Sequence, residues 1–249
     1  MSKILVFISI IFSLQVFANE LPQSRAVVES INRTVLSSEI GGKITYLKKK
    51  DGDSFKKGET LLKIECGVYI AERDKIGVKA GLARTKLKKN RQLSQYNSVG
   101  KFDVEISKLE LREQELAYKI ANINVKRCQI KAPFTGRVVK KFANKYQNVK
   151  PQQELLEVIN TDSLEIKSVV PANWLRWLKV GQEIVFKVDE VEEEIKTEVL
   201  QIDSVVDPKS QTINLRAEIK DSKNIISGMS GTVYFIPNES EKKVGYQND

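Results

Sequence analysis

Apolar and polar positions along the chain follow several patterns, and one of these patterns occurs twice. Residues 42–64 and 136–158 align without gaps, so that their apolar positions coincide. Short β-rich runs between Gly and Asp turns predict strands in each copy, including 43–47 and 60–64. A repeat at a fixed offset indicates one supersecondary unit used twice. We expect a small two-sheet sandwich in which each copy supplies one layer. The aligned pairs are Ile44/Val138, Phe55/Val149, Leu61/Leu155, Leu62/Leu156 and Ile64/Val158.

The segment between the two copies has helical periodicity and no proline from residue 69 to 127. Two helices are predicted, at 69–97 and 103–127, with apolar residues spaced by three and four as in a coiled coil. Gly100 is placed to end the first helix, and Asp103 to cap the second. The prediction is an antiparallel hairpin. Its facing residues are expected to be Tyr69, Ile76, Ala80, Ala83 and Leu87 on one helix, and Ile106, Leu109, Leu116, Ile120 and Ile123 on the other.

Charge supports the pairing of the two helices. The first carries eight basic and two acidic residues, whereas residues 103–115 of the second hold five acidic and two basic ones. Exposed ion pairs across the hairpin add only a few tenths of a kcal/mol each. Gly77 and Gly81 leave two interpretations open: they expose a flat stripe to a neighbouring copy, or they let the two helices approach closely.

Strand patterns return after residue 160. The expected strands are 164–170, 183–188, 195–206, 212–219 and 231–236, with a helical turn at 173–178. Short strands with Gly and Pro corners are typical of a small antiparallel β-barrel. Trp174 and Trp177 either plug the end of that barrel or contact a partner or a lipid surface, and the plug is favoured.

The chain begins like a secretory signal peptide. Lys3 precedes an apolar run at 4–17, and Ala18 follows it. The run is shorter than the roughly 20 apolar residues of a membrane span, so cleavage is favoured over retention as an anchor. No cysteine follows for lipid attachment. The mature chain is expected to be exported.

Composition excludes several function classes. The chain has 249 residues, a formal net charge of +9, two cysteines and no histidine. Without histidine the commonest general base and metal ligand are missing, and two cysteines are too few for a structural zinc site. The lysines lack the interleaved aromatics of a base-stacking surface. We therefore expect no enzyme, no metal, no cofactor and no nucleic-acid partner.

Several motifs resemble one family. The first copy, G-x-I-x-x-L followed by DGDSFKKGE, resembles the first half of a biotinyl/lipoyl domain, and IKAPFTGRV at 130–138 resembles the start of its second half in periplasmic adaptor subunits. DPKSQT at 207–212 and SGMSG at 227–231 resemble later motifs of the same proteins. The chain thus resembles the membrane fusion proteins of the HlyD/RND efflux type.

The resemblance implies a fold and a domain order. The fold class is mainly β with an α-helical hairpin: a lipoyl-like barrel-sandwich hybrid with an inserted coiled-coil hairpin, plus a small antiparallel β-barrel. The expected parts are a signal peptide (1–18), a lipoyl-like domain in two halves (25–66 and 129–160), the hairpin (67–128), the barrel (161–236) and a disordered tail (237–249).

The resemblance also implies partners. Such adaptors sit in the periplasm and link an inner-membrane transporter, with the RND type favoured, to an outer-membrane TolC-like channel. They assemble as homo-oligomers, either hexamers or trimers of dimers. The family's hairpin tip carries an Arg, Leu and Ser pattern, which Lys89, Leu93 and Gly100 match in part, without the hydroxyl. The expected docking residues at the tip are Lys89, Leu93, Asn97, Ser98 and Gly100.

The two cysteines flank the hairpin at its base. Cys66 precedes the first helix and Cys128 follows the second. In an oxidising exported compartment this placement favours a disulfide that clamps the hairpin, against the alternative of two buried free thiols. Two other function classes stay open: a lipoyl- or biotinyl-type carrier or accessory protein of an enzyme complex, and a stand-alone binding protein.

Overall fold

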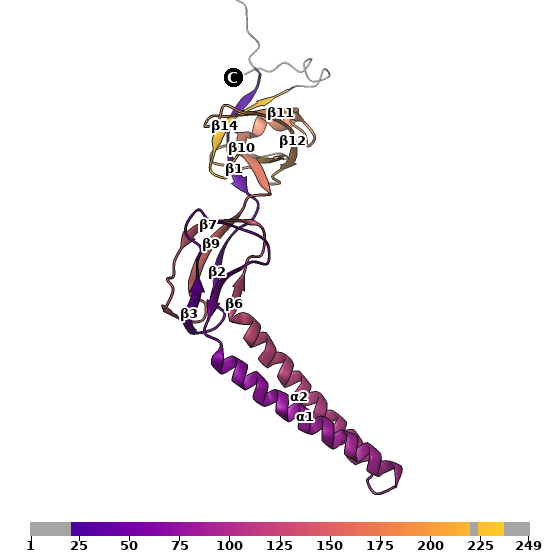
Figure 1. Cartoon of the computed structure of the whole chain (residues 1–249). Helices are drawn as coiled ribbons and strands as arrows, with labels where there is room; N and C mark the ends of the chain where they lie inside the picture. The colour runs from indigo at the N-terminus through magenta and orange to yellow at the C-terminus, as the bar shows by residue number, and fades with distance from the viewer. Residues whose placement is uncertain (1–20, 220–223, 237–249) are drawn as a thin grey trace, which may run out of the picture. The chain divides into compact units, whose positions relative to one another are not determined.

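A computed structural model describes residues 21–219 and 224–236 (Figure 1). The expected signal peptide and C-terminal tail lie outside the described residues. The described chain is mainly β, with two long helices, and it divides into two compact units. One unit, residues 28–165, contains two sheets and both helices. The other, built mainly from residues 166–219 and 228–236, is a closed barrel that also takes in residues 21–27.

Two four-stranded sheets form the sandwich of the first unit. The first has the strand order β2-β9-β7-β4, and the second has the order β6-β5-β3-β8. β7, β8 and β9 begin 94 residues after β3, β4 and β5, which is the distance between the two copies of the repeat, so the two sheets have the same internal arrangement. The strands are β2 (Arg33–Ser37), β3 (Gly42–Leu47), β4 (Ser54–Phe55), β5 (Thr60–Ile64), β6 (Gln129–Lys131), β7 (Gly136–Lys141), β8 (Asn148–Val149) and β9 (Glu154–Asn160).

The prediction that each copy supplies one layer is wrong. Each sheet joins two strands of one copy to a two-residue strand of the other: β4 pairs with β7, and β8 pairs with β3. The fourth strand of each sheet, β2 or β6, lies just before one of the copies in the sequence. A strand of two residues adds little to its own layer, but on the opposite sheet it covers an open edge. The exchange therefore interlocks the two copies around one shared core.

That core consists of the repeated apolar positions. Ile44, Leu61, Leu62, Leu155 and Leu156 have no exposed surface, and every other member of the aligned pairs is at most 4% exposed. β7 begins at a glycine because β9 passes very close to it. A Cβ on Gly136 would lie 1.9 Å from the carbonyl oxygen of Ile159, a distance that no side chain tolerates.

Both predicted helices are present as α1 (Gly67–Gln95) and α2 (Lys101–Arg127). The turn between them differs from the prediction. The residue with left-handed backbone after α1 is Asn97 (φ 54°), because Asn tolerates this conformation. Gly100 instead precedes α2, and Asp103 lies one turn inside it, where its carboxylate accepts a hydrogen bond from the Gly100 N–H at 3.2 Å.

The two helices run antiparallel and contact each other along one face each. On α1, all five predicted facing residues are buried or half-buried, and so are Arg73 and Asn90, which continue the same spacing. Cross-helix contacts keep one register: Lys86 pairs with Glu110, and Asn90 pairs with Ser107.

The predicted facing residues of α2 are wrong. Ile106, Leu109, Leu116, Ile120 and Ile123 are 38–62% exposed and lie on the outer face. The inner face uses a second series with the same three-and-four spacing, displaced by two residues. Cys128 belongs to that inner series, and its bond to Cys66 fixes which face of α2 turns toward α1. The inner series is Val104, Ser107, Leu111, Gln114, Tyr118, Ala121, Val125 and Cys128; all are buried or half-buried except Tyr118, which is 39% exposed but packs against Gly77 of α1.

The second unit is a closed six-stranded barrel with the order β1-β10-β13-β12-β11-β14. Its strands agree with the predicted ones, except that β12 ends at Ile202. β1 falls in the stretch expected to start the lipoyl-like domain, yet it pairs with β14 and closes the barrel. The elements are β1 (Gln23–Ser30), β10 (Leu164–Pro171), the short 3₁₀ helix η1 (Ala172–Arg176), β11 (Glu183–Val188), β12 (Glu194–Ile202), β13 (Thr212–Ile219) and β14 (Ser230–Phe235).

Candidate functional site

The base of the hairpin is fixed to the sandwich by a covalent bond. Cys66 and Cys128 form a disulfide with their Cα atoms 5.7 Å apart. Cys128 is 2% exposed and belongs to the sandwich core, against which Tyr69 of α1 also packs. At the end of α2, the Arg127 Nε lies 2.8 Å from the Glu39 carboxylate in the loop before β3. The predicted disulfide is therefore present, and it links the start of α1 to the end of α2 beside the sandwich core.

Along the shaft, polar contacts tie α1 to α2. Lys86 and Arg84 of α1 form ion pairs with Glu110 and Glu115 of α2, at 2.8 and 2.9 Å. These pairs are exposed and so contribute little individually. The half-buried Asn90 side chain also donates a hydrogen bond to the buried Ser107 hydroxyl at 2.6 Å, which in turn donates to the Asp103 backbone carbonyl. The shaft is thus held in register between base and tip.

The glycines of α1 have separate roles. A Cβ on Gly77 would lie 3.3 Å from the Tyr118 ring, so this glycine lets the large tyrosine pack between the helices. Gly81 has nothing within 4 Å of such a Cβ. It borders a shallow groove of about 280 Å³, which is also lined by Arg84, Glu115 and Tyr118. Gly77 is therefore explained by the close approach of the two helices, whereas Gly81 borders an open groove.

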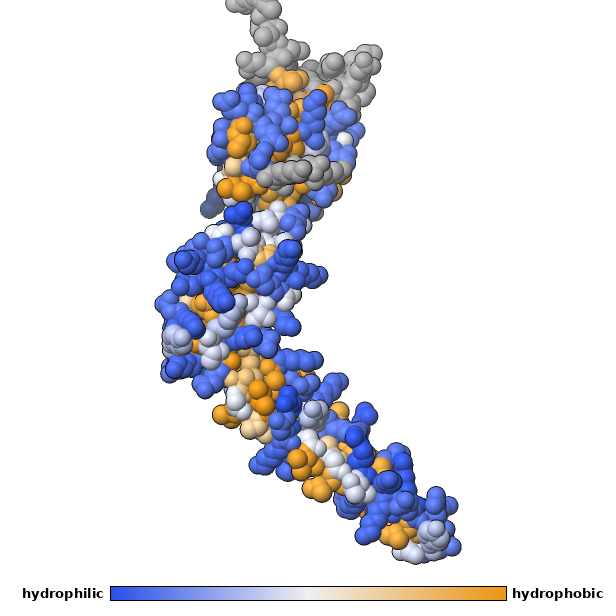
Figure 2. Space-filling view, in the orientation of Figure 1, coloured by the Kyte–Doolittle hydropathy of each residue, from blue (hydrophilic) through white to orange (hydrophobic). Residues whose placement is uncertain are grey.

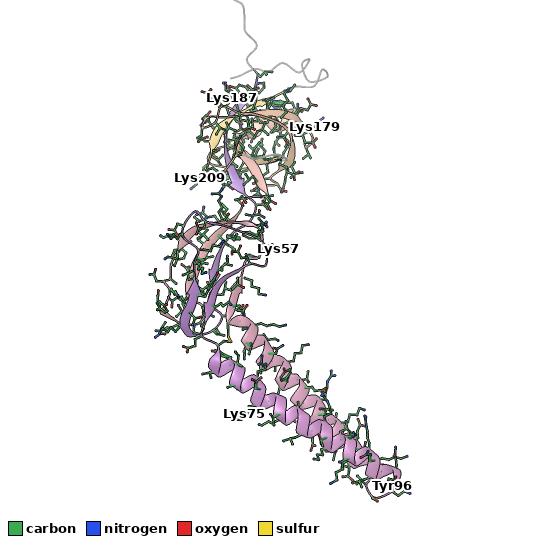
Figure 3. The ribbon with its side chains drawn as sticks, viewed as in Figure 1. Lys57, Lys75, Tyr96, Lys179, Lys187 and Lys209 are labelled. Atoms are coloured by element: carbon green, nitrogen blue, oxygen red, sulfur yellow. A yellow bond between two sulfur atoms is a disulfide. The ribbon has the colours of Figure 1, made fainter. Side chains whose placement is uncertain are left out.

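The tip of the hairpin, residues 93–103, presents two aromatic side chains to solvent. Tyr96 is 79% exposed and Phe102 is 77% exposed, and Figure 3 shows Tyr96 at the end of the helix pair. Phe102 lies in the first turn of α2. Tyr96 lies in a loop that is ordered by backbone hydrogen bonds, because the Leu93 carbonyl accepts from the N–H groups of both Tyr96 and Ser98. Exposed apolar rings on an ordered loop are unusual in a solvated turn and common in docking surfaces.

The structure brings four of the five predicted docking residues into this tip. Leu93 is half-buried and anchors the loop, while Asn97 and Ser98 are exposed within it and Gly100 ends it. Lys89 lies exposed on α1, one turn before Leu93. Tyr96 and Phe102 were missed, although a sequence signal existed: they are the only aromatic residues between Tyr69 and Tyr118.

The surroundings of the tip are basic. A groove of about 380 Å³ beside it is lined by Arg91, Ser94 and Gln95 of α1 and by Lys101 and Val104 of α2. Two of these five residues are cations, and none is an acid. The tip therefore offers apolar rings together with positive charge, which suits a partner surface with apolar pockets and acidic groups.

Acidic groups with a lowered pKa lie outside the hairpin and stabilise turns. In the sandwich, hydrogen bonds from the Lys49 side chain and the Lys56 backbone N–H lower the pKa of Glu59. In the barrel, the backbone N–H groups of Ser210 and Lys209 lower the pKa of Asp207. Asp207 opens the DPKSQT segment, so that motif forms a hydrogen-bonded turn.

The described residues hold neither a cluster of metal ligands nor a helix that could span a membrane. Within 21–219 and 224–236, no group of three or more His, Cys, Asp or Glu residues is arranged to hold a metal ion. In the same part of the chain, no helix has the length and apolar character needed to cross a membrane.

Comparison with known proteins supports the arrangement. No family model matches the chain. An uncharacterised protein of Haemophilus influenzae is 22% identical over 216 residues, which are 84% of this chain; the chain spans only 56% of that protein's length. Among solved structures, a MacA–MexA chimaera with the α-hairpin domain of Pseudomonas aeruginosa MexA aligns with a TM-score of 0.75 and 19% identity, over 88% of this chain and 79% of the chimaera.

A second structure decides the fold family. The membrane fusion protein Spr0693 of Streptococcus pneumoniae aligns with a TM-score of 0.71 and 15% identity, over 87% of this chain and 99% of its own. The fold is that of the membrane fusion proteins. A putative efflux transporter of Bacteroides eggerthii shares this fold, with a TM-score of 0.73 and 19% identity over 88% of this chain and 70% of its own. The resemblance found in the sequence is confirmed at the level of the membrane fusion protein fold.

Proposed function

We propose that this chain is a periplasmic adaptor of a tripartite efflux or secretion system. In this proposal it links an inner-membrane transporter, with the RND type favoured, to a TolC-like outer-membrane channel, and it performs no chemistry of its own. The observation that carries the proposal is the helical hairpin, which is inserted between the two halves of a lipoyl-like sandwich, clamped at its base and aromatic at its tip.

The clamp explains how such a hairpin can work as a spacer. α1 has 29 residues, which corresponds to about 43 Å at 1.5 Å per residue. A rotation at the base would move the tip of so long an arm by many ångströms. The disulfide and the Arg127–Glu39 ion pair oppose that rotation. The tip is then held at a defined position, and a channel can bind there without the entropic cost of ordering the hairpin.

The outer faces of the helices support assembly into a homo-oligomer. Figure 2 shows apolar side chains along the outside of the hairpin. The exposed apolar residues of α2 are the outer series from Ile106 to Ile123, and those of α1 include Val78 and Leu82, which are 66% and 68% exposed. Because α1 is basic and the first half of α2 is acidic, contact of α1 with α2 of the next copy is favoured over like-with-like contact. Such head-to-tail contacts close into a ring, as a hexamer or a trimer of dimers.

The test places a photo-crosslinking amino acid at position 96 in cells that make the native system. We expect a crosslink to an outer-membrane channel. The matched control is the same replacement at Tyr146, a tyrosine of the sandwich with 65% exposure, which should give no such product. Recovery of the channel from both positions, or from neither, would contradict the tip assignment.

A functional arm uses Tyr96→Asp/Phe102→Asp. These changes should abolish export with little change in stability, because both side chains are exposed. They are preferable to a charged residue at the half-buried Leu93, which anchors the loop. Tyr146→Asp is again the control.

Two other functions are less well supported. A carrier would display its modified lysine on the tight turn between the two halves of the lipoyl-like domain, but here α1 and α2 occupy that place. Intact mass separates the two functions, since a carrier would be heavier than its processed sequence. A stand-alone binding protein would remain monomeric by light scattering even with its partners present.

A further inference from the structure

The segment that follows β10 holds both tryptophans of the chain. Trp174 and Trp177 lie with ring centroids 5.2 Å apart, and each also contacts Phe235 of β14 edge-on, at 5.2 and 6.0 Å. Leu178 beside them is 2% exposed. The favoured interpretation of the tryptophans as a barrel plug therefore agrees with their packing, but both rings remain only half-buried.

The opposite side of this segment faces solvent. Leu175 is 43% exposed and Val180 is 64% exposed, and the cations Arg176 and Lys179 between them are exposed as well. Figure 3 shows Lys179 on the surface of the barrel. Residues 171–181 contain no acidic residue. A surface turn with two tryptophans, exposed aliphatic side chains and only positive charge has the composition of a membrane-interface segment.

The first and last described strands of the barrel meet at the same place. The Phe235 N–H donates to the Pro22 carbonyl at 2.9 Å, and the Ile236 N–H donates to the Glu183 carbonyl at 3.1 Å. The Gln182 side chain also donates to the Ile236 carbonyl. Two further exposed apolar residues, Leu21 (45%) and Ile236 (38%), are thereby held next to the tryptophan segment. We call this surface the barrel-end patch; its members are Leu21, Trp174, Leu175, Trp177, Val180 and Ile236.

We propose that the barrel-end patch binds the surface of an anionic phospholipid bilayer. Indole rings partition to the headgroup region, where their apolar faces and polar N–H groups are both accommodated. The Leu175 and Val180 side chains reach into the acyl boundary, while Arg176 and Lys179 bind lipid phosphates. This contact does not depend on which transporter or channel the chain serves, so it goes beyond the adaptor role.

The position of the patch along the chain favours lipid over a protein partner. Phe17 ends the apolar run that directs the chain to the membrane, and only four residues lie between it and Pro22 at the patch. An extended chain of that length spans at most about 17 Å. A retained run would hold the patch end of the barrel within that distance of the bilayer.

The size of the patch points the same way. Four exposed aliphatic side chains fall short of the roughly 800 Å² per partner of a stable protein interface. Weak contacts of this size suffice on a membrane when several copies of an oligomer bind together.

The two tryptophans make the proposal directly measurable, because all tryptophan fluorescence of the chain comes from the patch. The exported chain from Asn19 onward is mixed with protein-free vesicles of phosphatidylcholine, with or without phosphatidylglycerol. We expect a blue shift and quenching by brominated lipid. Affinity should be about tenfold higher for the anionic vesicles at low salt, and that preference should fall as salt rises.

Variants separate the patch from other surfaces. Leu175→Asp/Val180→Asp should reduce vesicle binding at least tenfold, and Arg176→Glu/Lys179→Glu should remove the preference for anionic lipid. Val35→Asp/Val139→Asp makes the same charge change at exposed valines of the sandwich and should leave binding unchanged. Urea unfolding followed by tryptophan fluorescence verifies that each barrel is folded.

Three results would overturn the proposal. Wild-type chain could show no fluorescence change with any vesicle. The sandwich variant could lose binding as strongly as the patch variant. A shift could occur only with native membrane vesicles and vanish after their proteins are digested, in which case the patch binds a protein. None of these results affects the crosslinking test of the hairpin tip, so the two proposals fail separately.

Discussion

Breaking the Cys66–Cys128 disulfide should destabilise the sandwich-and-hairpin unit by about 4 kcal/mol and leave the barrel unchanged. The bond closes a loop with a sequence separation of 62 residues. For a loop of that length, the chain-entropy model gives about 14 cal/mol/K, or about 4 kcal/mol at 25 °C. The loop contains the whole hairpin, so the reduced, unfolded chain gains a large amount of conformational freedom.

Two spectroscopic probes report on the two units separately. Both tryptophans lie in the barrel, whereas α1 and α2 lie in the other unit. Tryptophan fluorescence therefore follows the barrel, and far-UV circular dichroism mainly follows the hairpin unit. Unfolding in urea is compared for the oxidised chain, the reduced chain and Cys66→Ala/Cys128→Ala.

With a urea dependence of about 2 kcal/mol per molar, the circular-dichroism midpoint should fall by about 2 M in the reduced chain and in the variant. The fluorescence midpoint should not move. A circular-dichroism shift below about 0.5 M would refute the entropic reasoning. Equal shifts by both probes would instead show that the two units unfold together.

Three further predictions test individual contacts. Leu87→Ala in the seam between the helices should cost about 2–4 kcal/mol in chemical denaturation, whereas Leu109→Ala on the outer face should cost less than about 0.5 kcal/mol; similar costs would contradict the assigned faces. Gly136→Ala should cost about 3 kcal/mol or more because its Cβ would overlap a backbone carbonyl of β9, while Gly81→Ala, with open space, should stabilise α1 by about 1 kcal/mol in thermal melts. Hydrogen bonds lower the pKa of Glu59 in the folded state, so ionised Glu59 stabilises the fold at pH values above the pKa that it has in the unfolded chain. This stabilisation is lost as the pH falls through the lowered pKa of the folded state. Glu59→Gln should therefore flatten the acid limb of a curve of stability against pH, and an unchanged limb would exclude this role.

Much of the fold could be predicted because its signals are local or repeated. The strands at 60–64, 183–188 and 212–219 match the observed bounds, since turn residues flank runs of β-formers there. The repeat identified the buried positions of both halves because burial in a sandwich requires the same apolar spacing in each copy. The cysteines at the two ends of the hairpin indicated a disulfide because an antiparallel hairpin brings its ends together.

Other features depend on pairing between distant segments, which local patterns do not specify. The exchange of β4 and β8 between sheets is invisible in the sequence, because a two-residue strand has no period of its own. β1 resembles a sandwich strand in composition and is assigned to the barrel only by its hydrogen bonds to β14. At the tip, the family's Arg, Leu and Ser pattern drew attention to Leu93 and Gly100, and the exposed rings of Tyr96 and Phe102 were overlooked.

The face of α2 that contacts α1, which was wrongly predicted, bears directly on function. A helix with one apolar series needs one partner, but α2 carries two series of the same spacing on opposite faces. The inner one is less apolar, including Ser107 and Gln114, and it faces α1 because Cys128 lies within it. If burial of apolar surface alone had decided the pairing, the series with Leu109 and Ile120 would face α1 instead. The disulfide and the Asn90–Ser107 hydrogen bond favour the more polar face, and the more apolar series is left outside. An outer series that is more apolar than the covalently fixed inner one agrees with the proposed contact between the outer face of α2 and the basic α1 of another copy of this chain.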